Sequence, residues 1–547
     1  MNNIRLIDQH PAFHAVVGLI TVPLALREWF AVVNLLSAPK IRTTTLLLHA
    51  AVSLVLVKIL VSSFIKFNFY RRARSLGCGP VAVHPHKDPV LGLDLLLEAI
   101  PKLKSHKGIQ WMSDRLAKYG NTHFHLTLGG EWVILTNEPE NIKAILRTKF
   151  NDWPIGGIRL AAVLPILGEN SIFSTNGEAW RHNRAVLRPS FVRDQVADLA
   201  CFDKHTSNML ARIPRDGNST VDMQALLQDM TMDSASDFLF GYSTNMSTDH
   251  PEPGAREFAT AFDLANEECA NKTRINPILF RFPHKRLDAN VRIEREFIRK
   301  YLRKAAADRK ERLARGEPSK RPYVFLDELL EQNHPEEYLM DQLLSVIIAG
   351  RDTTAMAITT TLWYLARNPA CVEKLREEIA DLGKRDPTWE ELKDMKYLQN
   401  IIKEGLRLIA PQSTNSRIAN KDTVLPRGGG PDGRQPILVR KNQAVRWSSM
   451  SMQRRTDLYG PDADVFRPER WEEKGFRPGN NWEYIPFSGG PRICPGQQFA
   501  LTQVSYVLLR LFQTFKKIEA RDDDELRLLP TLTVSFALGC KVVLTPA

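Results

Sequence analysis

The sequence predicts one large domain, mainly α-helical with small β-sheets, behind an N-terminal membrane anchor. The 547 residues show no linker, internal repeat or shift in composition after about residue 75, so a single domain is expected. Long stretches such as DQLLSVIIAGRDTTAMAITTTLWYLARN and QQFALTQVSYVLLRLF carry apolar residues at helical spacing. A 22-residue apolar run precedes them and predicts the anchor.

The apolar run at 44–65 is long enough to cross a bilayer as a helix. Lys58 interrupts it, but lies close enough to its end for the ammonium group to reach the membrane surface. A basic cluster follows at once: Lys66, Arg71, Arg72 and Arg74. The positive-inside rule therefore places that end, and the domain behind it, in the cytosol. The alternative is an amphipathic core helix.

Residues 1–43 contain an earlier apolar stretch, which Pro23, Arg27 and Glu28 interrupt. Three alternatives stay open for it: a second span, a re-entrant segment, or a helix lying in the membrane interface. A cleaved signal peptide is not expected, because the basic cluster follows the stronger apolar run instead of preceding it.

The charge and cysteine content argue against two classes of protein. The formal net charge of +12 comes from scattered basic residues without an aromatic-interleaved stripe, so no nucleic-acid partner is expected. The six cysteines lie far apart without C-x-x-C spacing, which predicts a reducing compartment and no disulfide framework. Three N-x-S/T triplets would stay unglycosylated in a cytosolic domain; they begin at Asn218, Asn245 and Asn271.

One of these cysteines, Cys494, lies in the stretch FSGGPRICPG, between Gly490 and Gly496. Glycine lets the backbone turn tightly around the sulfur and point N–H groups at it, and these dipoles stabilise a thiolate. Because Pro495 has no N–H group, the amide of Gly496 is the expected donor. The helix expected next adds the positive end of its dipole. The pattern predicts a metal-ligating thiolate, against the alternative of an inert buried cysteine.

At these residues the chain resembles the cytochrome P-450 family of haem-thiolate monooxygenases. The family pattern F-x-x-G-x-R-x-C-x-G is complete, with Phe487, Gly490, Arg492, Cys494 and Gly496 at its fixed positions. The resemblance implies a single large haem-thiolate domain that binds haem b, with Cys494 as the axial iron ligand and the other four residues around the haem. A thiolate in that position favours cleavage of the O–O bond.

A second pair of segments fits the same family. Glu404 and Arg407 are three residues apart in IIKEGLRLIAPQ, which places both on one face of a helix. On their own they would make an ordinary surface ion pair. By resemblance, the pair locks onto Arg470 in the segment RPERW and supports the haem pocket without taking part in the chemistry.

The expected helix around AGRDTT carries residues that are costly inside a buried helix. A Thr353 hydroxyl bonded back onto the helix would bend it and open a groove, and Gly350 would let a flat ligand approach. By resemblance, Asp352 and Thr353 are the catalytic acid–alcohol pair that relays protons to dioxygen. The alternative for Asp352 is a solvated or helix-capping carboxylate.

Further positions are expected to bind haem. Trp180 and Arg184 are one helical turn apart in GEAWRHNRAVLRPSF, and Arg417 follows Arg407 by ten residues. By resemblance, Arg184 and Arg417 meet haem propionates, which bidentate guanidinium groups bind well. The alternative for each arginine is a surface charge on an amphipathic stem.

The resemblance implies a monooxygenase that places one oxygen atom into a C–H bond of an apolar small molecule. Electrons would come from NADPH through a separate NADPH-cytochrome P-450 reductase, because the chain has no flavin or dinucleotide fingerprint of its own. Stretches such as LRLIAPQ and GGPRICPGQQFAL are similar to the fungal group that oxidises alkanes and fatty acids at the chain end. Residues 153–173, the helix around Thr353, and residues 411–416 would contact the substrate, which predicts an apolar, elongated pocket.

Alternatives stay open for the substrate and the reaction. Gln453 stands where relatives often have His, and the same scaffold also hydroxylates fungal polyketides, terpenes and lipopeptides. A haem-thiolate isomerase or dehydratase would typically lack the acid–alcohol pair, and a membrane haem sensor would show no turnover. By resemblance to microsomal members, the membrane is the endoplasmic reticulum, residues 66–95 form a basic and Pro/Gly-rich hinge, and residues 96–547 form the catalytic domain.

Overall fold

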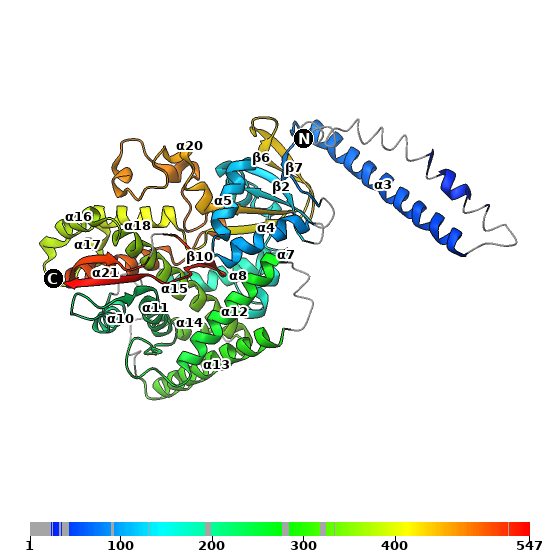
Figure 1. The fold of residues 1–547 in the computed structure, drawn as a ribbon. Coiled ribbons are helices and arrows are strands. Elements are labelled where there is room, and N and C mark those ends of the chain that lie inside the picture. The colour runs from blue at the N-terminus through cyan, green and yellow to red at the C-terminus, as the bar shows by residue number, and fades with distance from the viewer. Residues whose placement is uncertain are drawn as a thin grey trace.

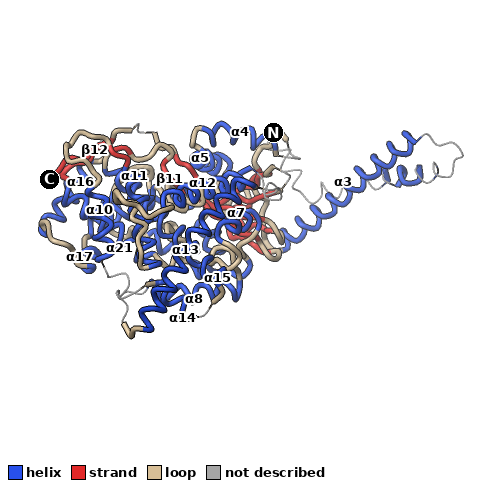
Figure 2. Tube along the Cα trace, turned by 90° about the horizontal axis from the view of Figure 1, so that it is seen from below, coloured by secondary structure: helices blue, strands red, loops and turns tan. Residues whose placement is uncertain are grey.

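The computed structural model describes residues 23–24, 26–31, 34, 43–88, 92–128, 131–191, 199–275, 284–317, 324–332, 334–522 and 525–547. Over these ranges the chain is mainly helical with four small sheets, as the sequence predicts. Figure 1 shows the course of the chain, and Figure 2 shows that helices make up most of the body.

Helix α3 (Thr43–Ser75) extends away from the body of the molecule (Figure 1). It includes the whole 44–65 run and continues through the basic cluster, so the first part of the expected 66–95 hinge is helical. Polar groups interrupt it, and a His49 imidazole nitrogen lies 2.7 Å from a carboxylate oxygen of Glu28.

The prediction of a transmembrane helix over 44–65 finds no support in the structure. Among the residues that the structure describes, no helix combines the length and the apolar character that crossing a membrane requires. Most of the segment 1–43, with its three open alternatives, lies outside the described residues.

A five-stranded sheet joins strands from both halves of the chain in the order β1-β2-β3-β8-β5. Strand β2 pairs antiparallel with β3, whereas β8 runs parallel to β3. The strands are β1 (Ala82–Val83), β2 (Thr122–Leu126), β3 (Trp132–Thr136), β5 (Thr414–Ile418) and β8 (Ala444–Ser448). Strand β5 at the edge carries Arg417 to the wall of the cavity described below.

Three smaller sheets complete the β structure of the described residues. One has the order β4-β12-β9, and the other two are the antiparallel pairs β6-β7 and β10-β11. Their strands are β4 (Val221–Asp222), β6 (Thr423–Gly429), β7 (Gln435–Val439), β9 (Phe515–Ala520), β10 (Leu528–Pro530), β11 (Val534–Phe536) and β12 (Lys541–Pro546).

The helices cover and connect these sheets. Up to residue 331 they are α4 (Leu93–Lys104), α5 (Gly108–Tyr119), α6 (Pro139–Lys143), α7 (Gly157–Leu167), α8 (Gly177–Leu187), α10 (Ala200–Ala211), α11 (Met223–Phe240), α12 (Ala255–Ile275), α13 (Lys285–Ala314) and α14 (Phe325–Glu331). After it come α15 (Glu336–Leu365), α16 (Pro369–Ile379), α17 (Trp389–Asp394), α18 (Lys396–Leu408), α19 (Ser449–Met452), α20 (Thr456–Tyr459) and α21 (Gln497–Thr514).

Helix α15 runs through the interior, and most of its side chains from Leu339 onward are buried. A helix that is apolar on nearly all sides is stable only when other elements cover it. Here α11, α18 and α21 pack against it. Helix α21 begins at Gln497, so the helix expected directly after Cys494 is present. These packed helices hold the loop that carries Cys494.

Candidate haem-thiolate site

A deep cavity lies between α7, α8, α15 and the loop before α21. It contains roughly 1990 Å³ of space between protein atoms, including its opening to solvent. Its walls are mostly apolar, with Ile155, Val163, Leu167, Phe173, Phe238, Val346 and Leu532 among the lining residues. All three segments expected to contact a substrate, around 153–173, 349–354 and 411–416, contribute side chains to it. The sulfur-bearing loop closes one side, since Cys494 also lines the cavity.

The loop before Cys494 is shaped by a close approach of two backbones. Gly490 has φ +66°, and a Cβ atom placed on it would lie 1.9 Å from the carbonyl oxygen of Leu146. Only glycine fits that position, because it lacks a Cβ atom and tolerates the left-handed region. The N–H of Cys494 donates to the carbonyl of Phe487 at 3.0 Å, which closes the turn.

The surroundings of the Cys494 sulfur act on its charge in opposite directions. Burial raises the pKa of the thiol above its ordinary value, while a hydrogen bond from the N–H of Gly496 and the positive charge of Arg184 lower it. The predicted amide donor is therefore the one that the structure places at the sulfur. Gly496 itself has an ordinary φ of −86°, so its contribution is the amide and not a special backbone conformation.

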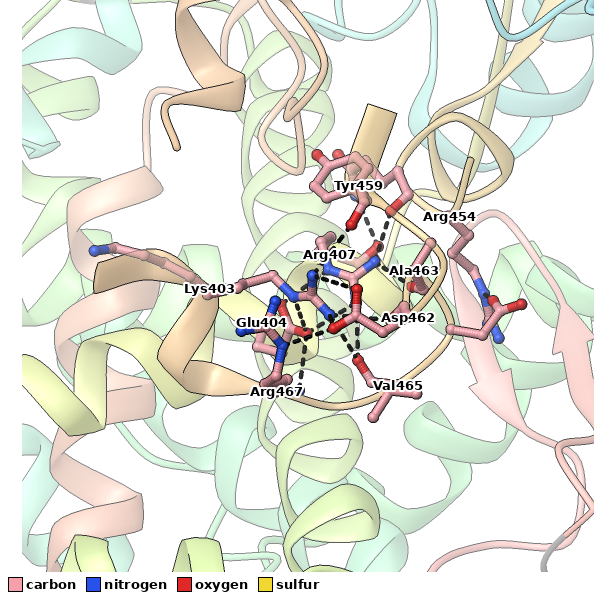
Figure 3. Close-up of polar contacts among 12 residues, drawn as sticks. Lys403, Glu404, Arg407, Arg454, Tyr459, Asp462, Ala463, Val465 and Arg467 are labelled. Carbon is pink, nitrogen blue, oxygen red and sulfur yellow. Dashed lines mark hydrogen bonds and ion pairs between the residues drawn. The ribbon is translucent and has the colours of Figure 1, made fainter. Parts of the chain in front are cut away.

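Figure 3 shows a cluster of polar contacts around Glu404 and Arg407, two side chains that are fully buried. Two nitrogens of Arg407 donate to the two carboxylate oxygens of Glu404 at 2.9 and 2.8 Å. Arg470 Nε donates to the same carboxylate at 2.8 Å. Arg407 also donates to the backbone carbonyls of Gln453 and Ala463 at 2.8 and 2.6 Å. The structure thus brings together the three residues that the sequence named as supports, and ties α18 to the segment 453–470.

Gln453 links this cluster to the cysteine loop, a role that the sequence did not indicate. Its side-chain nitrogen donates to the carbonyls of Leu406 and Arg407, at 3.2 and 3.0 Å. Its side-chain oxygen accepts from the N–H of Ile485 at 2.8 Å, two residues before Phe487. An amide both donates and accepts, so one side chain satisfies both segments. The only signal in the sequence was its departure from the usual histidine.

Four arginines line the cavity: Arg159, Arg184, Arg417 and Arg492. The sequence named the last three, while Arg159 was hidden in the apolar run IGGIRLAAVLPILG, where an isolated charge was the available signal. Arg492 donates to the Thr175 carbonyl at 2.9 Å, and its guanidinium lies 4.5 Å from the ring centre of Trp180. Arg184 donates to the Ile493 carbonyl at 2.9 Å, next to Cys494.

These four guanidinium groups have no carboxylate partner within the part of the chain that the structure describes. Among the same residues, the Nε atom of Arg159 is buried without a hydrogen-bond partner. Burial lowers the pKa of Arg492 to about 9, and the charges of Arg159 and Arg184 act in the same direction. Burial also lowers the pKa of Arg417, as do the charges of Arg159 and Arg492. Such a cluster requires an anion, because unpaired buried charge is costly.

The predicted acid–alcohol pair is split between two sides of α15. Thr353 lines the main cavity, and its hydroxyl donates back to the carbonyl of Ala349, as the sequence predicts. Asp352 instead lines a second cavity together with Gln224, Gln228 and Glu267. Asp352 and Thr353 are thus neighbours in sequence, but their side chains line different cavities.

Asp352 belongs to an ion-pair chain that joins α15 to α12. Arg351 Nη1 lies 3.0 Å from an Asp352 carboxylate oxygen and also pairs with Asp263 of α12. Burial and the charge of Asp263 raise the pKa of Asp352 while Arg351 opposes the shift, and the net result is a pKa of about 6. The group is thus neither a simple solvated nor a helix-capping carboxylate, but a buried one paired with an arginine.

The residues at the main cavity fit a haem. A thiol on one wall suits an iron ligand, an apolar slot suits a flat porphyrin, and four unpaired guanidinium groups suit two propionates. Cys494 would hold the iron, while Arg159, Arg184, Arg417 and Arg492 would hold the carboxylates. Trp180 would support Arg492 from below.

Comparison with known proteins identifies the family. The family model described as Cytochrome P450 matches residues 92–539. Cytochrome P450 monooxygenase himC of Aspergillus japonicus is 40% identical over 476 residues, covering 86% of this chain and 84% of himC. Cytochrome P450 monooxygenase fsdH of Fusarium heterosporum is 41% identical over 480 residues (86% and 83%), and Cytochrome P450 52E1 of Candida apicola is 38% identical over 472 residues (84% and 89%). The chain therefore belongs to the cytochrome P450 family of monooxygenases, in which a cysteine thiolate holds the haem iron.

Proposed function

We propose that this monooxygenase hydroxylates an unactivated C–H bond of an apolar substrate, with the terminal carbon of a fatty acid or alkyl chain as the best candidate. One observation carries the proposal: the Cys494 sulfur, the Thr353 hydroxyl and the apolar side chains of α7 face a single cavity. The sequence resemblance to the fungal alkane and fatty-acid hydroxylases supports the chain-like substrate.

The residues at the cavity have different roles in the proposed reaction. Haem, once bound through Cys494, supplies the activation of dioxygen and the attack on the C–H bond. Side chains such as Ile155, Val163 and Leu167 exclude water and hold the apolar substrate by burial. Thr353 offers a hydroxyl that can pass a proton on the cavity side of α15. A proton taken up by Asp352 reaches this hydroxyl only when the Asp352–Arg351 ion pair opens, since the two side chains face different cavities.

The electrons for this reaction come, in our proposal, from NADPH through a separate NADPH-cytochrome P-450 reductase. The chain carries no flavin or dinucleotide fingerprint, which supports a separate donor. The net charge of +12 is compatible with docking of an acidic partner.

The central test incubates the haem-loaded chain, reductase and NADPH with fatty acids and alkanes of medium and long chain length. We expect products 16 mass units heavier, as one oxygen atom adds, with fragmentation that places the oxygen at the chain end. Products oxidised in mid-chain would contradict the terminal assignment. NADPH-independent rearrangement of a peroxide substrate would instead identify an isomerase or dehydratase, and no turnover at all would favour a haem sensor.

Replacement of Thr353 tests its proton relay. Thr353→Ala should lower product formed per NADPH several-fold and release hydrogen peroxide, because the hydroxyl on the cavity side is lost. Thr359→Ala is the matched control: it is buried on the same helix and donates back to the Ala355 carbonyl at 2.7 Å, but lies outside the cavity lining. If Thr353→Ala forms as much product per NADPH as the parent chain, Thr353 does not relay the proton.

A tailoring hydroxylase of a fungal polyketide, terpene or lipopeptide is the second candidate. The monooxygenases of Aspergillus japonicus and Fusarium heterosporum match this chain at 40% and 41% identity, slightly above the 38% of Cytochrome P450 52E1. Incubation with a metabolite extract of the host, followed by mass spectrometry, separates this candidate from the first. Oxygen would then enter a ring-containing metabolite while fatty acids stay unchanged.

We also propose that the N-terminal part attaches the protein to the endoplasmic reticulum membrane. Exposed apolar side chains of α3, among them Val57, Val61, Phe64 and Ile65, support the proposal, together with the basic residues that follow them. Deletion of residues 1–75 should move the chain from the membrane fraction to the soluble fraction. A full-length chain found in the soluble fraction would contradict the proposal.

A further inference from the structure

A second cluster of ligating side chains lies outside the haem cavity, where α10 meets α11. Cys201 and His205 are one turn apart on α10, and Asp237 comes from α11. One ligating atom of each residue lies within 4.8 Å of the ligating atoms of the other two. The sulfur, imidazole nitrogen and carboxylate oxygen are therefore gathered from two helices at one point.

In this cluster only one of the two ring nitrogens of the histidine has a hydrogen-bond partner among the described residues. His205 is 0% exposed, and its Nε2 lies 2.9 Å from a carboxylate oxygen of Asp237. Its other ring nitrogen, Nδ1, is buried without a hydrogen-bond partner among the described residues. A buried imidazole normally satisfies both nitrogens. The nitrogen that faces the carboxylate is Nε2, so an ion shared by the three residues would replace the hydrogen between Nε2 and Asp237, and the ring proton would then sit on Nδ1.

The charges at this point also favour a cation. Asp237 is 2% exposed, and Lys204 lies 3.2 Å from its carboxylate with a side chain that is 49% exposed. Because about half of the Lys204 side chain reaches solvent, an ion bound at Asp237 could replace this ammonium group as the cation beside the carboxylate. Cys201 lies in the first turn of α10, where helix N–H dipoles favour the thiolate, the form that binds metals.

We propose that Cys201, His205 and Asp237 form a site for a zinc-class divalent cation that joins α10 to α11. The donor set of thiolate, imidazole and carboxylate is typical of zinc and unlike the all-oxygen sets of magnesium and calcium. Three protein ligands leave a fourth tetrahedral position for water. Binding releases the thiol proton of Cys201 to solvent, so that two negative ligands balance the double charge of the ion.

The test measures zinc in the haem-loaded full chain, purified without a polyhistidine tag. The protein is stripped with a chelator, equilibrated with zinc chloride at micromolar concentration, separated by gel filtration and analysed for zinc and haem iron. We expect about one zinc per chain, and a thermal midpoint that rises with zinc concentration because the ion binds the folded state. Magnesium chloride should produce neither effect.

Single substitutions decide whether the ion occupies this cluster. Cys201→Ala, at a half-buried position that tolerates a small side chain, should weaken zinc binding at least tenfold and abolish the zinc-dependent rise of the midpoint. Asp237→Asn keeps a similar shape and should weaken binding too. Cys78→Ala, a half-buried cysteine outside the cluster, serves as the control and should bind zinc like the parent chain. Equal zinc retention by Cys201→Ala, or no retention by the parent chain, would overturn the proposal, whatever the hydroxylation assays show.

Discussion

At Gly490 the carbonyl oxygen of Leu146 occupies the space that any side chain would need. This contact fixes how the loop approaches Cys494, because the segment 144–148 packs on the turn Gly490–Arg492. The neighbouring Gly496 faces an ordinary contact, with the Phe191 ring 3.4 Å from a built Cβ atom. The two glycines of this motif thus have different roles. Gly490 allows two backbone segments to approach closely, whereas Gly496 provides a donor amide for the sulfur.

A pair of alanine substitutions separates steric clash from backbone strain. Gly490→Ala should prevent haem incorporation, because it adds a clash of 1.9 Å to an unfavourable φ of +66°. Gly475→Ala is the control, with a similar φ of +88° and open space around it. It should cost only about 1 kcal/mol of backbone strain and leave haem loading intact. Absorbance of the haem band per chain measures both, and normal loading of Gly490→Ala would contradict the packing argument.

Helix α18 acts as a support because its ion pair is completely enclosed. Glu404 and Arg407 are each 0% exposed, and their hydrogen bonds reach residues 46 to 66 positions later in the chain. Removing one partner of such a pair strands the other charge without solvent. The sequence spacing alone was compatible with a surface ion pair, which contributes little to stability. Because this pair is buried, its loss costs far more.

Substitution of Arg407 tests this support against a surface pair. Arg407→Ala should destabilise the fold by about 3–5 kcal/mol, since Glu404 and two backbone carbonyls lose their donor. Arg385→Ala breaks the Arg385–Glu391 pair, whose side chains are 53% and 35% exposed. That change should cost less than about 1 kcal/mol. Denaturant unfolding measures the difference, and equal effects of the two variants would contradict the role of burial.

Helix α13 carries a buried acid that makes stability depend on pH. Glu294 is 0% exposed, and neither carboxylate oxygen has a hydrogen-bond partner among the described residues. Burial raises the pKa of Glu294 to about 8, and the charge of Arg295 opposes the shift only in part. A raised pKa in the folded state means that the contribution to stability is complete below about pH 4.5 and is lost as the pH rises to 8.

Replacement of this acid should therefore change the pH profile of unfolding. Glu294→Gln should be progressively more stable than the parent chain between pH 5 and pH 8, with a slope of at most about 1.4 kcal/mol per pH unit for one proton. Glu296→Gln, at an exposed position of the same helix, should follow the parent at every pH. A constant difference between Glu294→Gln and the parent would show that the carboxyl does not titrate in this range.

The cofactor site exists only at the level of the whole molecule. Arg159, Arg184, Arg417 and Arg492 come from α7, α8, β5 and the cysteine loop, and they meet across one cavity. Their charges repel one another when no anion is present, as their mutual lowering of pKa shows. Haem binding should relieve this cost, so the fold and the cofactor stabilise each other.

Substitution of Arg159 tests this coupling between charge and cofactor. Arg159→Met should raise the thermal midpoint of the haem-free chain, which loses an unpaired buried charge, and lower that of the haem-loaded chain, which loses a propionate partner. Arg434→Met, with a side chain 81% exposed, should change neither midpoint. A shift in the same direction with and without haem would contradict a role in holding the propionates.

The sequence alone predicted Cys494 as the candidate iron ligand and located the residues that support its loop, because their chemistry depends on local spacing. The pattern around Cys494, the helical pairing of Glu404 with Arg407 and the back-bonded Thr353 all appear in the structure where the pattern placed them. Local hydrogen bonds and turns depend on residues that are close in sequence, so they can be predicted from a sequence pattern.

Only the tertiary structure decided which distant groups share an environment. It turned Asp352 towards Arg351 and a second cavity, made Arg159 a fourth cation at the main cavity, and gave Gln453 its link between α18 and Ile485. It also brought Cys201 and His205 to Asp237 across two helices. Burial and the meeting of segments hundreds of residues apart arise from packing of the whole chain, and no local spacing encodes them.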